Sequence, residues 1–134
     1  MSKYAIGFES GELFPVKFLD DVAPNTVKAF KEALPLHGEC LQARFAGEEF
    51  FFNADIDVEK ENIVQPYHGA IAFNSDPEWK AVCIYYGSTI EMGEDEPFNL
   101  FAEVTGDLDK LKEVGERIWK EGKEKIAFLK VPEK

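Results

Sequence analysis

The sequence predicts a mostly β domain, an antiparallel sheet of about eight strands closed into a barrel, with a helix over each open end. Two observations support this prediction. Short apolar or alternating runs, separated by turn residues, recur along the chain as is typical of strands. The two segments with helical periodicity lie far apart in the sequence, so strands do not alternate with helices as in a doubly wound fold. The 134 residues suit one domain, residues 1–134.

The first two strands are expected to form a hairpin. Residues 3–9 and 12–19 alternate between apolar and polar side chains on either side of Ser10-Gly11, a pair that is typical of a tight turn. Proline has no N–H for a sheet ladder, so Pro15 indicates a sheet edge or a bulge in the second strand.

A short amphipathic helix is expected over residues 24–34. Pro24 suits the first helical position, and Pro35 ends the helix because the residue before a proline avoids the α region. A helix of this length is marginally stable alone, so its apolar face must pack against the sheet. That face carries Val27, Phe30 and Leu34.

Two strands are expected next, at residues 40–45 and 49–53, with Gly47 in the turn between them. The second of them contains three consecutive phenylalanines. Because side chains alternate in a strand, Phe50 and Phe52 share one face and Phe51 takes the other. Both faces of this strand are therefore expected to be at least partly covered.

Residues 53–65 are polar and are expected to form a solvated loop. Their alternating acids resemble the start of a calcium-binding loop. Such a loop needs glycine at its sixth position and glutamate at its twelfth, where this chain has Lys60 and Pro66. Calcium binding is therefore not expected here.

The second half of the chain supplies the remaining elements. A helix is expected between Asp107, which is a good N-cap, and Gly122, which ends it. Gly69 indicates a bulge or a close approach of backbone within the first of the later strands. These strands are expected at residues 67–73, 81–86, 98–104 and 125–131.

The composition argues against several classes of protein. A net charge of −11 disfavours nucleic acid, and lysines interleaved with glutamates leave no basic patch. No apolar run approaches the roughly 20 residues of a membrane span, and the N-terminus does not resemble a signal peptide. We therefore expect a cytoplasmic protein with no nucleic-acid or membrane partner. Cys40 and Cys83 are expected to be free buried thiols, with a cross-strand disulfide as the alternative, and no cofactor is expected.

Several stretches resemble cyclophilins. Ala23-Pro24-Asn25-Thr26-Val27, followed by Phe30 and Leu34, resembles the first cyclophilin helix, and residues 98–118 resemble a later cyclophilin strand with its glycine and helix. The resemblance is stronger to small uncharacterised bacterial and archaeal cyclophilin-like proteins, and it covers most of the chain. It implies a cyclophilin-like closed barrel. The stretches that carry the stronger resemblance are 45–52, 75–79, 83–87 and 106–112.

The resemblance implies one candidate catalytic residue, Arg44. Cyclophilins place an arginine near the end of the strand after the first helix. It is thought to hydrogen-bond the prolyl nitrogen and weaken the amide resonance that makes rotation slow. The glutamine and the paired glycines that follow in cyclophilins are absent from this chain. The alternative is a surface arginine paired with Glu48 or Glu49.

A shallow ligand pocket is expected near Arg44, because several polar and aromatic groups lie at strand ends or beside turns. Its expected ligand-binding residues are Glu49, His68, Tyr85 and Phe98.

A metal site is an open alternative for the two histidines. His37 and His68 would form one if they met across the sheet with Glu39 or Glu49. No short spacing such as His-x-His supports this, so two ordinary histidines at strand ends, and no metal, are expected.

These observations lead to the expectation of a cytosolic binding domain for a peptide or a small molecule. An active peptidyl-prolyl isomerase using Arg44 is the alternative. A third reading is an oligomerising structural domain, a homodimer for example, joined through an edge at residues 98–104 and the phenylalanine-rich strand.

Overall fold

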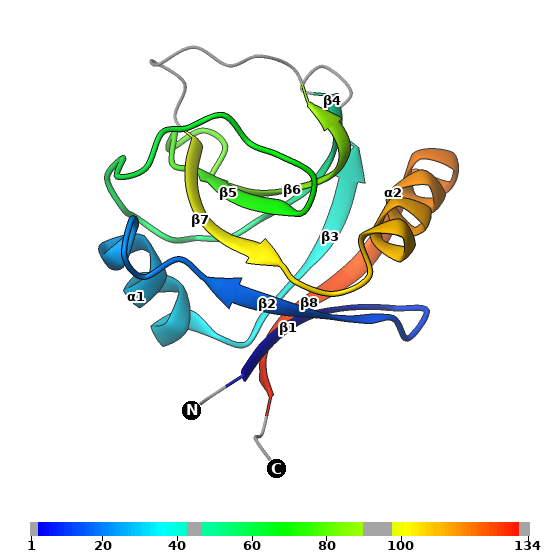
Figure 1. Cartoon of the computed structure of the whole chain (residues 1–134), viewed down its shortest axis with the longest axis horizontal. Helices are drawn as coiled ribbons and strands as arrows, with labels where there is room; N and C mark the ends of the chain where they lie inside the picture. Colours follow the sequence, from blue (N-terminus) through cyan, green and yellow to red (C-terminus); the bar gives the residue numbers. More distant parts are fainter. Residues whose placement is uncertain (1–2, 43–46, 90–97, 132–134) are drawn as a thin grey trace.

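The computed structural model describes residues 3–42, 47–89 and 98–131. Their strands pair antiparallel and close into a barrel in the order β1-β2-β7-β5-β6-β4-β3-β8 (Figure 1). The predicted fold class, eight strands and two helices, is confirmed for this part of the chain. The elements are β1 (Lys3–Phe8), β2 (Leu13–Phe18), α1 (Pro24–Ala33), β3 (Leu36–Gln42), β4 (Gly47–Asn53), β5 (Ala70–Asn74), β6 (Ala81–Thr89), β7 (Phe98–Val104), α2 (Leu108–Glu121) and β8 (Lys123–Val131).

Closure of the barrel bears on the third reading of the sequence, the oligomerising domain. That reading placed a sheet edge at residues 98–104, but β7 pairs with β2 on one side and β5 on the other. The phenylalanine-rich strand β4 likewise lies between β3 and β6. A closed barrel has no edge strands to offer to another chain. An interface through a β7 edge is therefore wrong.

The hairpin of β1 and β2 is confirmed. Gly11 has a φ of +103° in the turn, a conformation that suits glycine, and its N–H donates to the Phe8 carbonyl at 2.9 Å. Pro15 is opposite Ala5 of β1, but the β2 ladder with β7 begins only at Val16. The proline therefore lies just beyond the ladder with β7, where its missing N–H breaks no hydrogen bond of that ladder.

Helix α1 closes one end of the barrel through its predicted apolar face. Phe30 is fully buried, and its ring stacks on Phe101 of β7 with centroids 4.2 Å apart. The Phe73 ring of β5 meets it edge-on at 5.2 Å. Val27 is also buried, whereas Leu34 caps the C-terminus of the helix and is half-buried.

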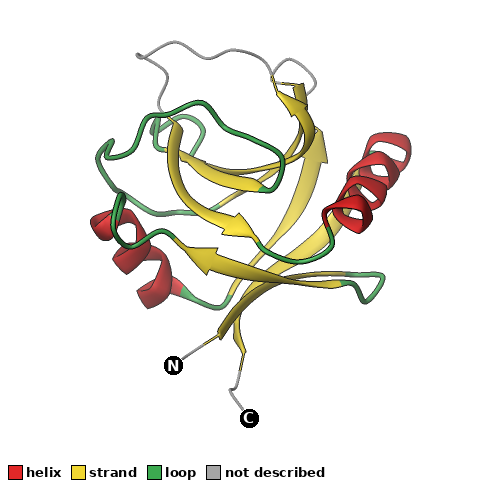
Figure 2. Cartoon of the chain, in the orientation of Figure 1, coloured by secondary structure: helices red, strands yellow, loops and turns green. Residues whose placement is uncertain are grey.

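Helix α2 lies on the opposite side of the barrel from α1 (Figure 2). The predicted caps are confirmed: the Asp107 carboxylate accepts a hydrogen bond from the Lys110 N–H at 3.1 Å, and Gly122 ends the helix with a φ of +96°. Gly115 faces the Tyr86 ring so closely that a side chain there would overlap it. Neither described helix is long and apolar enough to cross a membrane.

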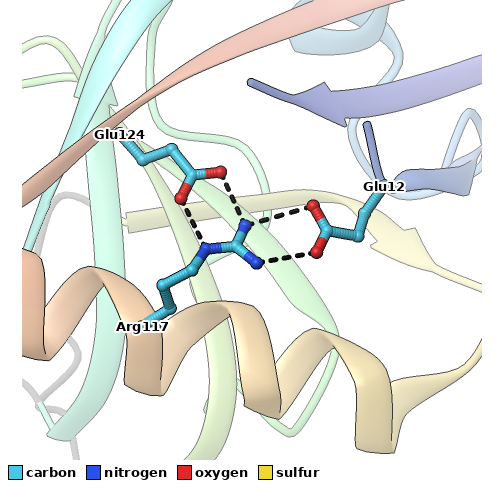
Figure 3. Close-up of polar contacts among 3 residues, drawn as sticks. All are labelled: Glu12, Arg117 and Glu124. Carbon is cyan, nitrogen blue, oxygen red and sulfur yellow. Dashed lines mark hydrogen bonds and ion pairs between the residues drawn. The ribbon is translucent and has the colours of Figure 1, made fainter. Parts of the chain in front are cut away.

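A charged clamp joins α2 to the hairpin and to β8 (Figure 3). Arg117 of α2 donates to Glu12 from Nη1 at 2.7 Å and from Nη2 at 3.1 Å. It donates to Glu124 of β8 from Nε at 2.7 Å and from Nη2 at 2.6 Å. The hydrogen bonds from Arg117 hold the pKa of Glu12 below its usual range. Parts of the chain that are more than 100 residues apart are thereby tied together.

Some strand boundaries differ from those predicted. β3 begins at Leu36 instead of Cys40, because it pairs with β8 as soon as the chain has passed Pro35. β5 begins at Ala70 instead of Tyr67, because Gly69, with a φ of +95°, lies in a turn and not in a strand. These are differences of pairing, which local sequence pattern does not encode.

Candidate functional site

The sheet formed by β4, β6, β5 and β7 has two covered faces. Phe50 and Phe52 point into the barrel and are fully buried, whereas Phe51 points outward, so the predicted division is confirmed. We call the second apolar group, on the outside of this sheet, the outer-face cluster. Its buried members are Ala70, Ala72, Ala81, Cys83, Tyr85 and Leu100, and Leu19, Phe51 and Phe98 pack against it.

Glu49 is a buried acid on the same outer face. It lies directly opposite Tyr85 in the β4–β6 ladder, one pair away from Phe51 and Cys83 on that face. Only 1% of Glu49 is exposed. Its Oε2 atom is buried and has no hydrogen-bond partner among the described residues. An unpaired buried oxygen of this kind is rare in folded proteins and calls for an explanation.

The surroundings of Glu49 disfavour its charge. Burial raises the pKa of Glu49 to about 7, and a hydrogen bond with the Cys83 side chain opposes this only in part. Burial, helped by the charge of Glu49, raises the pKa of the Cys83 thiol well above its usual range. A carboxyl group with a pKa near neutral can bind a ligand in either protonation state and can give or take a proton. Perturbed groups of this type are common at functional sites.

A segment of chain that we call the crossing segment, residues 61–66, passes over the outer-face cluster. At one end, Asn62 accepts a hydrogen bond from the Leu100 N–H at 2.9 Å and donates from Nδ2 to the Leu100 carbonyl at 3.0 Å. At the other end, Thr89 of β6 bonds Gln65 at 3.2 Å and the Pro66 carbonyl at 3.3 Å. β5 lies between these two anchors, and the inside of the barrel is filled by the core, so the segment crosses outside (Figure 1).

The beginning of the crossing segment is attached to α1. Ala23, at the N-cap of α1, offers no side-chain cap. Glu61 replaces it, since its carboxylate accepts from the Thr26 N–H at 2.6 Å, the Thr26 hydroxyl at 2.7 Å and the Asn25 N–H at 3.2 Å. Asn99, fully buried in β7, accepts from the Glu61 N–H. The loop predicted to be solvated is therefore largely held in place.

The structure places the predicted ligand-binding residues in two groups. Glu49, Tyr85 and Phe98 share the outer face. His68 is in the turn before β5, and its charge acts on Glu48. Arg44 lies outside the described residues. A role in ligand binding stays a prediction for each of them.

His68 is associated with a different acid. Hydrogen bonds from the Ser88 backbone and side chain hold the pKa of Glu48 below its usual range, and the charges of Lys112 and His68 add to this. The Nε2 atom of His68 is buried and has no hydrogen-bond partner in the described part of the chain. Glu48 and Glu49 are neighbours in β4, yet they are held by different partners.

Metal-binding groups do not gather in the described ranges. His37 is exposed on β3, opposite Ala127 of β8. No group of three or more histidine, cysteine, aspartate or glutamate side chains within residues 3–42, 47–89 and 98–131 could hold a metal ion. Cys40 and Cys83 are free and buried, as predicted.

Two hollows formed by described residues lie elsewhere on the surface. A groove of about 710 Å³ lies beside β1, β2 and α1, with Lys31 extending over the Tyr4 and Phe18 rings. A second, of about 480 Å³, lies between α1 and residues 57–61. Glu49 lines neither of these two hollows.

Sequence reasoning missed two residues, Cys83 on the outer face and Glu61 at the start of the crossing segment. Cys83 was treated only as a buried thiol, although alternation along β6 places it on the same face as Tyr85. Glu61 was assigned to a solvated loop, and no local signal connects it with a helix that begins 37 residues earlier.

Two solved structures share the fold. The structure of McbB in complex with tryptophan matches with a TM-score of 0.76 and 16% sequence identity, over 98% of this chain and 45% of McbB. The chain thus spans less than half of McbB. The solution structure of the hypothetical protein AF2241 from Archaeoglobus fulgidus matches with a TM-score of 0.68 and 24% identity, over 97% of this chain and 95% of that one. At these identities the likeness shows the fold alone.

The sequence comparisons identify a family. No curated protein matches the chain in sequence. A family model described as "Protein of unknown function (DUF3830)" matches residues 9–129, which is most of the chain. The chain therefore belongs to the DUF3830 family.

Proposed function

We propose that this protein binds a small molecule or a peptide on the outer face of its barrel, beside Glu49. The observation that carries the proposal is the Glu49 carboxyl group, which is 1% exposed and has an Oε2 atom without a hydrogen-bond partner among the described residues. A buried carboxyl group with an unpaired oxygen is destabilising, and glutamine or an aliphatic residue would avoid its charge. A ligand that donates a hydrogen bond to this oxygen explains why a carboxyl group is buried at this position.

The side chains around Glu49 suit a ligand with an apolar body. Tyr85 and Cys83 flank it across the ladder, and Phe51 follows it on β4. Small-molecule sites are mostly apolar and aromatic, with a few polar groups that fix orientation. The outer face has this composition, with Phe51 and Tyr85 beside the small side chains of Ala70 and Ala72.

Glu49 is 1% exposed, so a ligand reaches it through a local opening of the structure. At the Thr89 end of the crossing segment, the Gln65 side chain bonds the Thr89 hydroxyl at 3.2 Å in an exposed position, and the Thr89 hydroxyl bonds the Pro66 carbonyl at 3.3 Å. Exposed hydrogen bonds open at lower free-energy cost than those of the core. We therefore propose that the Gln65 end opens to admit the ligand, while the end at Asn62 stays attached to β7.

A fold neighbour adds support. McbB, which has the same barrel, was solved in complex with tryptophan, a small aromatic ligand. The low identity and the partial coverage of McbB mean that no residue role transfers from it. It supports only the idea that a protein that contains this barrel binds a small aromatic molecule.

An NMR titration of the ¹⁵N-labelled protein with indole tests the proposal. Indole should shift amides of β4 and β6 on the outer face, around Glu49 and Tyr85. Phe51→Ala removes part of the aromatic wall and should weaken binding about tenfold. Leu13→Ala is the control, since Leu13 is an exposed apolar residue of the hairpin. Shifts confined to other surfaces, or none at millimolar indole, would overturn the proposal.

Isomerase activity through Arg44 stays the second candidate, suggested by the cyclophilin resemblance. It predicts that wild type accelerates cis/trans exchange of a short Xaa-Pro peptide above the uncatalysed rate of minutes, and that Arg44→Ala does not. Exchange spectroscopy at equilibrium measures both. Equal rates with wild type, the variant and no protein would exclude this activity.

A further inference from the structure

The charge of Glu49 has no matching cation among the described residues. Its pKa is governed by burial and by the Cys83 side chain, and no lysine, arginine or histidine of residues 3–42, 47–89 and 98–131 contributes. A carboxylate that is shielded from water, and that has no cation beside it in the described part of the chain, interacts strongly with a cation that a ligand brings.

The groups that face Glu49 leave this role to the ligand. From β6 they are the Tyr85 phenol and the Cys83 thiol, whose pKa is raised well above its usual range by burial. On the same face, β5 contributes the apolar residues Ala70 and Ala72. β7 contributes Leu100, opposite Ala72, and the acid Glu103, opposite Ala70, whose carboxylate accepts a hydrogen bond from the Tyr67 hydroxyl at 3.0 Å. In the crossing segment, Glu61 is bonded to α1, while Asn62 and Gln65 are uncharged.

The aromatic rings beside Glu49 also favour a ligand that carries a cation. Tyr85 is the direct cross-strand neighbour of Glu49, and Phe51 is two residues along the same face. Ring faces attract cations, and they also stack on flat apolar skeletons. The net charge of −11 raises the local concentration of cations around the whole molecule.

We propose that the ligand of the outer face is a protonated amine carried on an aromatic or apolar skeleton, with its ammonium group bound to Glu49. This inference rests on the proposed function and names its ligand class. The ammonium donates to the Glu49 carboxylate, and the skeleton packs on Phe51 and Tyr85. No bond is made or broken, and the only exchange is one proton, which Glu49 releases to solvent when the amine binds its carboxylate.

Three indoles of similar size test the charge. Tryptamine carries an ammonium group, 3-ethylindole is neutral, and indole-3-propionate carries a carboxylate. At pH 8, tryptamine should bind at least about tenfold more tightly than 3-ethylindole, since a hydrogen bond to a charged group accounts for that factor. Indole-3-propionate should bind most weakly. NMR titration reports affinity and location together.

The pH dependence of tryptamine binding is a second test. Glu49 must lose its proton before it can pair with the amine, so tryptamine affinity should fall about tenfold between pH 8 and pH 6. The affinity of 3-ethylindole should change little over this range. Glu49→Gln should abolish both the preference for tryptamine and its pH dependence.

Glu48→Gln is the matched control, because it removes one negative charge from the adjacent residue, whose carboxylate is bonded to Ser88 instead. It should leave the preference for tryptamine over 3-ethylindole in place.

The possible outcomes separate this inference from the proposed function. If tryptamine and 3-ethylindole bind the outer face equally, or the anion binds best, the amine inference is overturned and outer-face binding stands. If Glu48→Gln abolishes the preference as Glu49→Gln does, general charge attraction explains it and the inference is also overturned. If no probe shifts an outer-face amide, the proposed function fails and the inference fails with it.

Discussion

Arg117 meets Glu124 side-on, with Nε and Nη2 each donating to one oxygen of the carboxylate, at 2.7 and 2.6 Å (Figure 3). The side chain of Glu124 is only 4% exposed, so this pair is largely shielded from water. The remaining donors of Arg117 go to Glu12. Arg117 therefore pairs with two carboxylates, one from the β1–β2 hairpin and one from β8.

Arg117→Met should destabilise the protein by about 3 kcal/mol, because it leaves the buried Glu124 carboxylate without a partner. Urea unfolding at pH 7 measures this loss. Lys120→Met is the control, since it removes an exposed cation from the same helix and should change stability by less than about 0.5 kcal/mol. In the double variant Arg117→Met/Glu124→Met, much of the stability should return. A double variant as unstable as the sum of both single changes would contradict this account.

Glu49→Gln should change stability in a pH-dependent way. Because burial raises the pKa of Glu49 to about 7 from the ordinary 4.5, the native state holds a proton that the unfolded chain has lost between these values. Wild-type stability should therefore fall as pH rises from about 4.5 to 7 and stay reduced above. Removing the acid should stabilise the protein by about 3 kcal/mol at pH 8 and hardly at all at pH 4.5.

Urea midpoints across this pH range, compared with those of Glu48→Gln, check the prediction. Since hydrogen bonds from Ser88 lower the pKa of Glu48, that control should not become more stable with rising pH. A stabilisation by Glu49→Gln that is the same at both pH values would rule out a titrating buried carboxyl.

Glu61→Gln should weaken both α1 and the crossing segment. The Glu61 carboxylate accepts three hydrogen bonds at the N-terminus of α1, where negative charge is also favoured by the helix dipole. The expected loss is about 1 kcal/mol, with faster amide exchange at Thr26. Glu59→Gln makes the same charge change at an exposed side chain of the same loop and should have little effect. Equal effects of the two variants would show that loop charge, not capping, matters.

Gly115→Ala should be destabilising although alanine is the better helix former. The added methyl group would overlap the Tyr86 ring, so α2 must move away from β6. We expect a net loss of about 2 kcal/mol, measured by thermal or urea unfolding. Glu116→Ala, at the exposed neighbouring position, should be neutral or slightly stabilising. A Gly115→Ala protein as stable as wild type would mean that the contact with Tyr86 relaxes freely.

Elements with strong local signals were predicted well. The caps of α2 at Asp107 and Gly122, the turn at Gly11 and the alternation of Phe50, Phe51 and Phe52 all follow from the conformational preferences of individual residues. The start of β3 at Leu36 could not be predicted in this way. It depends on pairing with β8, about 90 residues later in the chain, and such pairing leaves no mark in the local pattern.

Only part of the candidate site could be predicted, because the local sequence pattern does not show which distant segments come into contact. Glu49, Tyr85 and Phe98 were chosen because they lie near strand ends, and the structure puts all three on one face. His68 met the same criterion but faces other surroundings, since a residue in a turn has no alternation to fix its direction.

The sequence by itself determined which segments are strands and helices, where the helices begin and end, and that a single acidic domain has enough apolar residues for a core. These properties arise from interactions between near neighbours in the chain. Only the tertiary structure decided that Glu49 is buried opposite Tyr85, that Glu61 caps α1, and that β7 has no free edge. Burial and charge pairing depend on which distant segments come into contact. Closure of the barrel fixes the neighbours of all its strands together.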